Sequence, residues 1–102
     1  MAVIDLVSFN AQTDTYSLII VEKRPWDGSG KRLLELQQRV NDYLSFALDG
    51  EMLRIYPETR GKHVRILLSC MSEPDSRTSE FLRMAADRCR ENGVEFALQV
   101  LK

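Results

Sequence analysis

The sequence is poor in the residue types that metal sites, disulfide frameworks and nucleic-acid interfaces need. It has two cysteines, Cys70 and Cys89, and one histidine among 102 residues. Two isolated cysteines are too few for a structural zinc site or for the disulfide framework of a small secreted domain. Its 14 basic and 15 acidic side chains give a net charge of −1, so no positive excess is available to neutralise phosphates. We therefore expect a reduced, cytoplasmic protein that binds no nucleic acid.

Long apolar runs and targeting segments are also missing. No run approaches the ~20 residues that cross a bilayer, and no cationic segment precedes the apolar residues at the start of the chain. A length of 102 residues with 44% apolar residues suits one folded unit, because chains of this size bury roughly two-thirds of their unfolded surface. We expect a single α/β domain over residues 1–102, with no membrane segment and no cofactor.

The apolar pattern predicts the element order β-β-α-β-α-β. Alternating and β-branched runs predict strands at residues 2–9, 15–23, 63–70 and 94–100. Amphipathic stripes predict one helix over 32–48 and a second from Pro74 to the Asn92-Gly93 stop. The short turn after residue 9 makes the first two strands antiparallel, whereas a helix between strands makes them parallel. Residues 51–61 are expected to form a loop.

This order predicts an α+β two-layer sandwich, a four-stranded mixed sheet with two helices packed on one face. Right-handed crossovers bring both helices to the same side. Two helices about 10 Å wide match the breadth of four strands about 4.8 Å apart, so the other face stays uncovered. That face is expected to carry Ile19, Val21, Leu67, Ala97 and Leu101 among Ser17, Arg65, Glu95 and Gln99. It is more apolar than a solvated face needs to be, which favours a protein contact there.

Three aromatic residues are candidates either for contact or for local packing. Trp26 lies in a loop, where it either folds over the start of the first helix or meets a partner, since Trp is frequent in interface hot spots. Phe46 lies off the apolar stripe of its helix. It either packs beneath the 51–61 loop, against residues such as Met52 and Tyr56, or anchors a contact. Trp26, Phe46 and Tyr56 are therefore candidate binding residues.

Gly28-Ser-Gly-Lys31 follows a strand and opens a helix, which is the setting of a phosphate-binding loop. The full pattern needs a glycine where Pro25 stands and a hydroxyl residue where Arg32 stands. A capped helix start is therefore the simpler interpretation.

Cys70 ends a strand, and Arg77 follows near a helix start, as in cysteine-dependent phosphatases. The arginine comes one residue later than that motif requires, so a core cysteine is the simpler interpretation. Open parallel sheets nevertheless bind ligands at the carboxyl ends of their strands. The alternative function is therefore a phosphate- or nucleotide-binding protein that uses the loops at 28–32 and 70–77, with Gly30, Lys31, Cys70 and Arg77 as its site residues.

Short motifs spread along the chain carry a family resemblance. They are Val3-Ile4-Asp5, Trp26-Asp27, Leu33-Leu34, Leu36-Gln37, Asn41, Tyr43-Leu44, Phe46, Gly50, Tyr56-Pro57, Gly61-Lys62 and Pro74. With these motifs the chain resembles a family of small, standalone bacterial proteins known only as a domain of unknown function. Arg32 stands where that family often has His, and Cys70-Met71-Ser72 replaces a more aromatic stretch. The resemblance implies one compact α/β domain in the bacterial cytoplasm and brings no activity with it.

The leading functional prediction is a non-catalytic protein-interaction module. No set of titratable residues converges on a catalytic or metal-binding pattern, so we predict neither catalytic residues nor metal ligands. We expect self-association, such as a homodimer, through the uncovered sheet face or the region of Trp26 and Phe46. A regulatory or antidote-like binder of another bacterial protein fits the same pattern.

Overall fold

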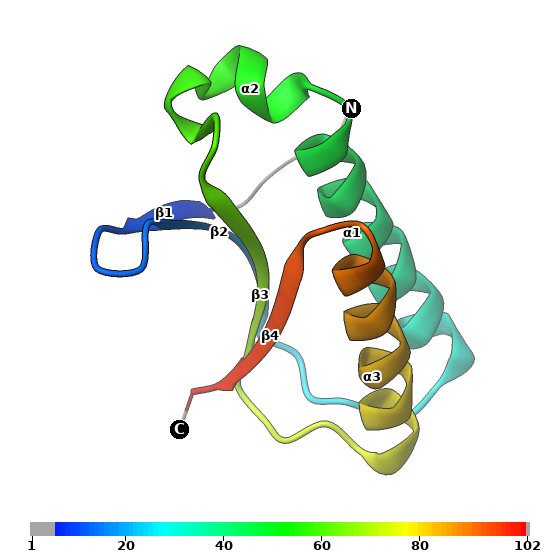
Figure 1. The fold of residues 1–102 in the computed structure, drawn as a ribbon. Helices are drawn as coiled ribbons and strands as arrows, with labels where there is room; N and C mark the ends of the chain where they lie inside the picture. The colour runs from blue at the N-terminus through cyan, green and yellow to red at the C-terminus, as the bar shows by residue number, and fades with distance from the viewer. Residues whose placement is uncertain (1–5, 102) are drawn as a thin grey trace.

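The computed structural model describes residues 6–101, and residues 2–5 of the first predicted strand lie outside that range. Its strands are β1 (Leu6–Asn10), β2 (Thr15–Glu22), β3 (His63–Cys70) and β4 (Glu95–Val100). Its helices are α1 (Gly30–Leu48), α2 (Glu51–Ile55) and α3 (Ser76–Glu91), with a 3-10 turn at Pro57–Thr59. Figure 1 shows α1 and α3 side by side on one face of the sheet, with α2 beyond one end of it. The predicted α+β sandwich with a mixed sheet is confirmed.

The sheet has the strand order β1-β2-β3-β4. β1 pairs with β2 in the antiparallel sense, while β2 with β3 and β3 with β4 are parallel. The parallel connections run through α1 and α3, and each returns on the same side, as a right-handed crossover requires. Within residues 6–101, β1 and β4 are therefore the two edges of the sheet.

Both long helices begin at a side chain that accepts a backbone hydrogen bond. The Ser29 hydroxyl accepts from the amide of Arg32 at the start of α1, and the Asp75 carboxylate accepts from the amide of Thr78 at the start of α3. After α3 the chain turns at Gly93, whose φ of 76° is accessible to glycine at little cost. These start and stop signals explain why α3 lies close to its predicted bounds.

The predicted loop over residues 51–61 is wrong, because it contains α2 and the 3-10 turn. A helix of five residues is too short to show a 3.6-residue period, so the pattern of the sequence did not reveal it. Met52 of α2 is buried and packs in the same core as Phe46 of α1. Phe46 is thus buried although it lies off the predicted apolar stripe of α1. The structure leaves Leu48 of α1 exposed.

The core lies between the sheet and the two long helices. Leu18 and Ile20 of β2 and Ile66 and Leu68 of β3 are each 0% exposed. They alternate with side chains that point to the opposite face, where Ile19, Val21 and Leu67 are partly exposed and only the small Ser17 and Ser69 are buried. The sheet thus has one face covered by α1 and α3 and one that they leave open.

Candidate interaction surface

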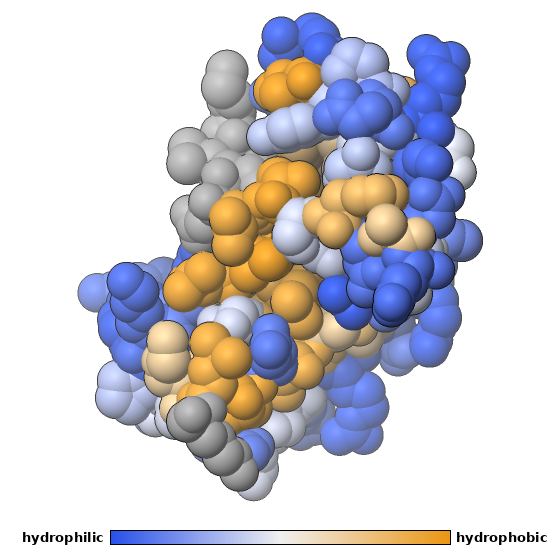
Figure 2. Space-filling view, turned by 90° about the vertical axis from the view of Figure 1, so that its left-hand side faces the viewer, coloured by the Kyte–Doolittle hydropathy of each residue, from blue (hydrophilic) through white to orange (hydrophobic). Residues whose placement is uncertain are grey.

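The open face of the sheet carries a row of apolar side chains, one from each strand. The strand register places Leu6, Ile19, Leu67 and Ala97 next to one another across the sheet. Leu6 is 52% exposed, and the other three side chains are partly exposed. Figure 2 shows a continuous hydrophobic area across this side of the molecule, bordered by hydrophilic side chains.

We call this area the bare sheet face and define it by Leu6, Ile19, Val21, Leu67, Ala97 and Leu101. Leu101, just after β4, is 40% exposed, and its backbone amide donates to the carbonyl oxygen of Cys70 over 2.8 Å. The predicted apolar residues of this face are therefore solvent-accessible together. An apolar area that spans several strands is unusual on a surface that contacts water alone.

The charges on this side of the sheet are balanced. Among the strand residues described here, Arg65 and Glu95 carry its full charges, and they are direct partners in the register of β3 and β4. Arg65 also donates from Nε to the hydroxyl of Ser17 over 3.1 Å. The polar border therefore presents one positive and one negative group beside the apolar row, with no excess of either sign.

The predicted contact residue Trp26 is held by the protein itself. Its indole N–H donates to the backbone carbonyl of Ser72 over 3.1 Å, and the guanidinium of Arg32 lies 5.4 Å from the ring centroid. The ring is partly buried against the core. Of the two alternatives for Trp26, the structure favours folding over the start of α1.

Phe46 and Tyr56 are likewise directed inward. Phe46 is 3% exposed and lies in the core with Met52, which is the first of its two predicted alternatives. Tyr56 is partly buried against the same core, and its carbonyl accepts from the amide and hydroxyl of Thr59. The structure therefore does not bring Trp26, Phe46 or Tyr56 together with the bare sheet face as an exposed aromatic cluster.

Sequence reasoning missed a group of charges at the carboxyl end of β2, where the carboxylate of Glu22 meets three arginines. The Oε1 atom of Glu22 lies 2.7 Å from Nε of Arg24 and 2.8 Å from Nη2 of Arg32. Its Oε2 atom lies 3.6 Å from Nη1 of Arg39. The Glu22 side chain is 8% exposed, so this is a nearly buried carboxylate. We call these four residues the Glu22 cluster.

The arginines of the Glu22 cluster have further partners within the chain. Arg32 donates to the carbonyl of Pro25 over 2.7 Å, and Arg39 donates to the carbonyl of Val21 over 3.4 Å. The cavity between these side chains measures only about 10 Å³. This cavity is too small for a phosphate group. The ion pairs of the Glu22 cluster instead attach α1 to the end of β2.

The comparisons with known proteins identify a family. A family model described as a family of unknown function, DUF6572, matches residues 1–102. The chain belongs to DUF6572. No curated protein and no solved structure matches it. Membership in DUF6572 therefore agrees with the resemblance seen in the sequence and assigns no reaction, ligand or partner.

In this DUF6572 chain the two loops of the predicted phosphate site do lie together. Arg77 donates from Nη1 to the carbonyl of Gly28 over 3.1 Å. A Cβ atom at Gly28 would lie 3.7 Å from Oδ2 of Asp75, so a carboxylate stands beside this loop. The amide of Thr78 lowers the pKa of Asp75, which keeps that carboxylate charged. This negative charge beside the loop would repel a bound anion.

Cys70 does not have the exposure of a nucleophile. It is 0% exposed, and its Sγ atom lies 3.7 Å from the carbonyl oxygen of Gln99. Burial raises the pKa of the Cys70 thiol, which favours the neutral form. Gly30 and Lys31 are exposed at the start of α1, and none of the four residues lines the cavities found in the described residues. The four residues of the predicted phosphate site therefore do not converge on one cavity.

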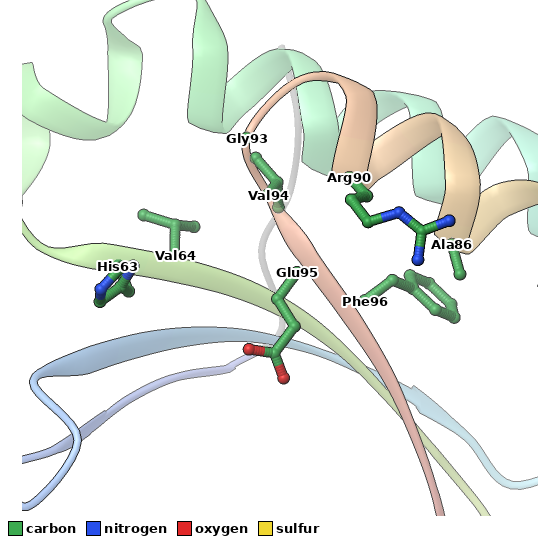
Figure 3. A pocket seen from close by; sticks show the side chains of 8 residues that line it. All are labelled: His63, Val64, Ala86, Arg90, Gly93, Val94, Glu95 and Phe96. Atoms are coloured by element: carbon green, nitrogen blue, oxygen red, sulfur yellow. The ribbon is translucent and has the colours of Figure 1, made fainter.

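Within residues 6–101, no group of three or more His, Cys, Asp or Glu side chains is arranged to hold a metal ion. No helix in the same range is long and apolar enough to cross a membrane. The cavity of about 320 Å³ at the amino end of β4 was not foreseen from the sequence. Figure 3 shows that its lining comes from β3, the end of α3 and β4, with the Arg90 side chain extending over Phe96.

Proposed function

We propose that this DUF6572 protein is a non-catalytic interaction module that associates with a second copy of itself through the bare sheet face. The observation that carries the proposal is the apolar row of Leu6, which is exposed, and Ile19, Leu67 and Ala97, which are partly exposed; the row crosses the whole sheet. Removing apolar surface from water is favourable by about 25 cal/mol per Å². A second layer on this side would supply the cover that α1 and α3 supply on the other.

Charge balance supports a second copy as the occupant. A partner with a strongly acidic or basic surface would leave Arg65 or Glu95 facing a like charge. In a symmetric pair the same patch faces itself, so Arg65 of each copy can approach Glu95 of the other. These opposite charges at the border of the patch favour the symmetric arrangement, although exposed ion pairs add little to affinity.

A cytoplasmic location and the absence of nucleic-acid binding are parts of the same proposal. Both cysteines, Cys70 and Cys89, are free, which suits a reducing compartment. The net charge of −1 provides no electrostatic attraction for a phosphate backbone.

The test is a charge placed in the middle of the apolar row. In Leu67→Lys the ammonium group would have to be desolvated at the centre of the interface, so we expect at least tenfold weaker association by sedimentation velocity. Leu34→Lys is the matched control, because Leu34 on α1 is 67% exposed and lies outside the bare sheet face. Circular dichroism would verify that both variants fold. A wild-type protein that stays monomeric at high micromolar concentration would remove the proposal, as would equal association of the two variants.

A further inference from the structure

A second surface follows from the way β4 ends the sheet. Among the strands of residues 6–101, β4 pairs with β3 alone. The amide of Leu101 donates to the carbonyl of Cys70, so Leu101 directs its backbone groups toward β3. The other odd-numbered residues of this segment, Glu95, Ala97 and Gln99, direct their N–H and C=O groups the same way. Successive residues of a strand direct these groups to opposite sides. Phe96, Leu98 and Val100 therefore direct their backbone donors and acceptors away from the sheet.

The edge also has few of the features that block strand addition, because Glu95 at its start is its one charged side chain. Exposed edges in natural proteins are protected by lysines, prolines or bulges, and Glu95–Val100 contains no lysine or proline. Leu98 points to the same face as the buried Ile20 and Leu68, which are its neighbours in the register. It is nevertheless 44% exposed, so α3 leaves the outer side of β4 uncovered.

We propose that this edge binds a second copy of the chain, which adds its own β4 in the antiparallel sense. The register follows from the backbone. Placing Leu98 opposite Leu98 of the second copy, and Phe96 opposite its Val100, pairs every outward N–H and C=O group of the three residues. A shift by two residues in one direction would pair Val100 with Val94, whose amide already donates to the carbonyl of Cys89 over 2.9 Å. A shift in the other direction would need a partner for Phe96 beyond residue 101.

The side chains suit the same register. On the helix-covered face, Leu98 meets Leu98 and Phe96 meets Val100, which are apolar cross-strand pairs. On the other face, Glu95 meets Leu101 and Ala97 meets Gln99, so no like charges stand opposite one another. The cavity of about 320 Å³ lies beside Phe96 and Ala86 at this edge, where Val100 of the second copy approaches (Figure 3).

This inference goes beyond the proposed function, because it uses a different surface. The symmetry axis of the edge pair stands perpendicular to the sheet, so both copies keep their helices on the same side. The bare sheet faces of the two copies then lie side by side and remain open. Association by the edge and association by the bare sheet face can therefore occur in one molecule.

The first experiment is a cross-link at the axis. In Leu98→Cys the two new cysteines lie opposite each other with Cα atoms about 5.5 Å apart, within the range of a disulfide. The native cysteines are both 0% exposed and do not compete. We expect mild oxidation to give a covalent dimer on non-reducing electrophoresis, with much less dimer from Ala97→Cys, whose partner is Gln99. Leu34→Cys measures the cross-linking that random collisions give. The inference would be overturned if Leu98→Cys gave no more covalent dimer than Leu34→Cys.

A second, non-covalent experiment separates the two surfaces. Leu98→Lys places a charge at the edge axis and should weaken edge association at least tenfold while leaving the bare sheet face intact. Leu67→Lys does the reverse. If Leu98→Lys associates like the wild type and Leu67→Lys does not, the edge inference is overturned and the proposed function stands. The opposite result overturns the proposed function and supports the edge, and a wild-type monomer overturns both.

Discussion

The Glu22 cluster and the bare sheet face present opposite kinds of surface. The cluster gathers three arginines around one carboxylate, which resembles a site built for an anion. Its members are bound to one another and to backbone carbonyls, and they leave almost no space. The bare sheet face has few polar groups, yet its apolar row has no cover within the described residues. The proposed function therefore rests on the uncovered apolar surface and not on the convergence of charges.

The largest expected loss of stability comes from comparing substitutions on the two faces of β3. Leu68→Ala opens a cavity in the core under α1 and α3 and should cost about 4 kcal/mol of unfolding free energy. Leu67→Ala removes an equal side chain from the bare sheet face and should cost the monomer about 1 kcal/mol or less. Urea denaturation at low protein concentration measures both. Similar losses would mean that the bare sheet face is already packed within one chain.

Next is the Glu22 cluster itself. Glu22→Gln leaves the nearly buried guanidinium of Arg32 without its counter-charge, and we expect a loss of about 3 kcal/mol in urea denaturation. Association by sedimentation should stay unchanged. Glu35→Gln is the control, since its contact with Arg24 is exposed and is worth about 1 kcal/mol or less. A stable Glu22→Gln protein would show that the arginines are not committed to the fold.

A smaller effect concerns the start of α3, where Asp75 accepts from the amide of Thr78. That hydrogen bond lowers the pKa of Asp75 in the folded state. The stabilisation is therefore present above the ordinary carboxyl pKa of about 3.9 and is lost as the pH falls through the lower folded value. Asp75→Asn keeps a capping oxygen without the charge. The urea midpoint of Asp75→Asn should lie below that of the wild type at neutral pH and approach it in acid. A difference between the two midpoints that stays the same at all pH values would show that the charge of Asp75 is not the cause.

For phosphate compounds we expect no change in stability. Because the arginines are bound internally and Asp75 stands beside Gly28, inorganic phosphate and nucleotides should not raise the melting temperature. Sodium chloride at matched ionic strength is the control for screening. A saturable rise with phosphate alone would break the contrast between the two regions and restore the alternative function at residues 28–32 and 70–77.

Much of the fold follows from local patterns in the sequence. The period of two in β3 and β4, the stripes of α1 and α3, and the serine and aspartate caps are each contained within a few neighbouring residues. The short helix α2 was missed, because five residues do not show a helical period and Met52 is buried only in the assembled core. The Glu22 cluster was missed for the same reason. Its arginines follow no common spacing, and only the folding of α1 back along β2 brings them to one carboxylate.

The site was predicted in part. Ile19, Val21, Leu67, Ala97 and Leu101 were identified from alternation, because side chains on a strand must point to one face or the other. The open edge at β4 was not, because alternation is the same for an edge strand and a central one. The alternation predicts Leu98 as a core residue, but it is exposed because β4 has no further strand beside it within the described residues.

The sequence by itself determined the elements, their order and which side chains share a face, since these depend on the steric periods of helix and strand. Only the tertiary structure decided which strands lie at the edges of the sheet, which charged side chains pair with one another inside the protein and which apolar side chains stay uncovered. Those outcomes depend on contacts between residues far apart in the chain, where the free energy of packing outweighs local preference.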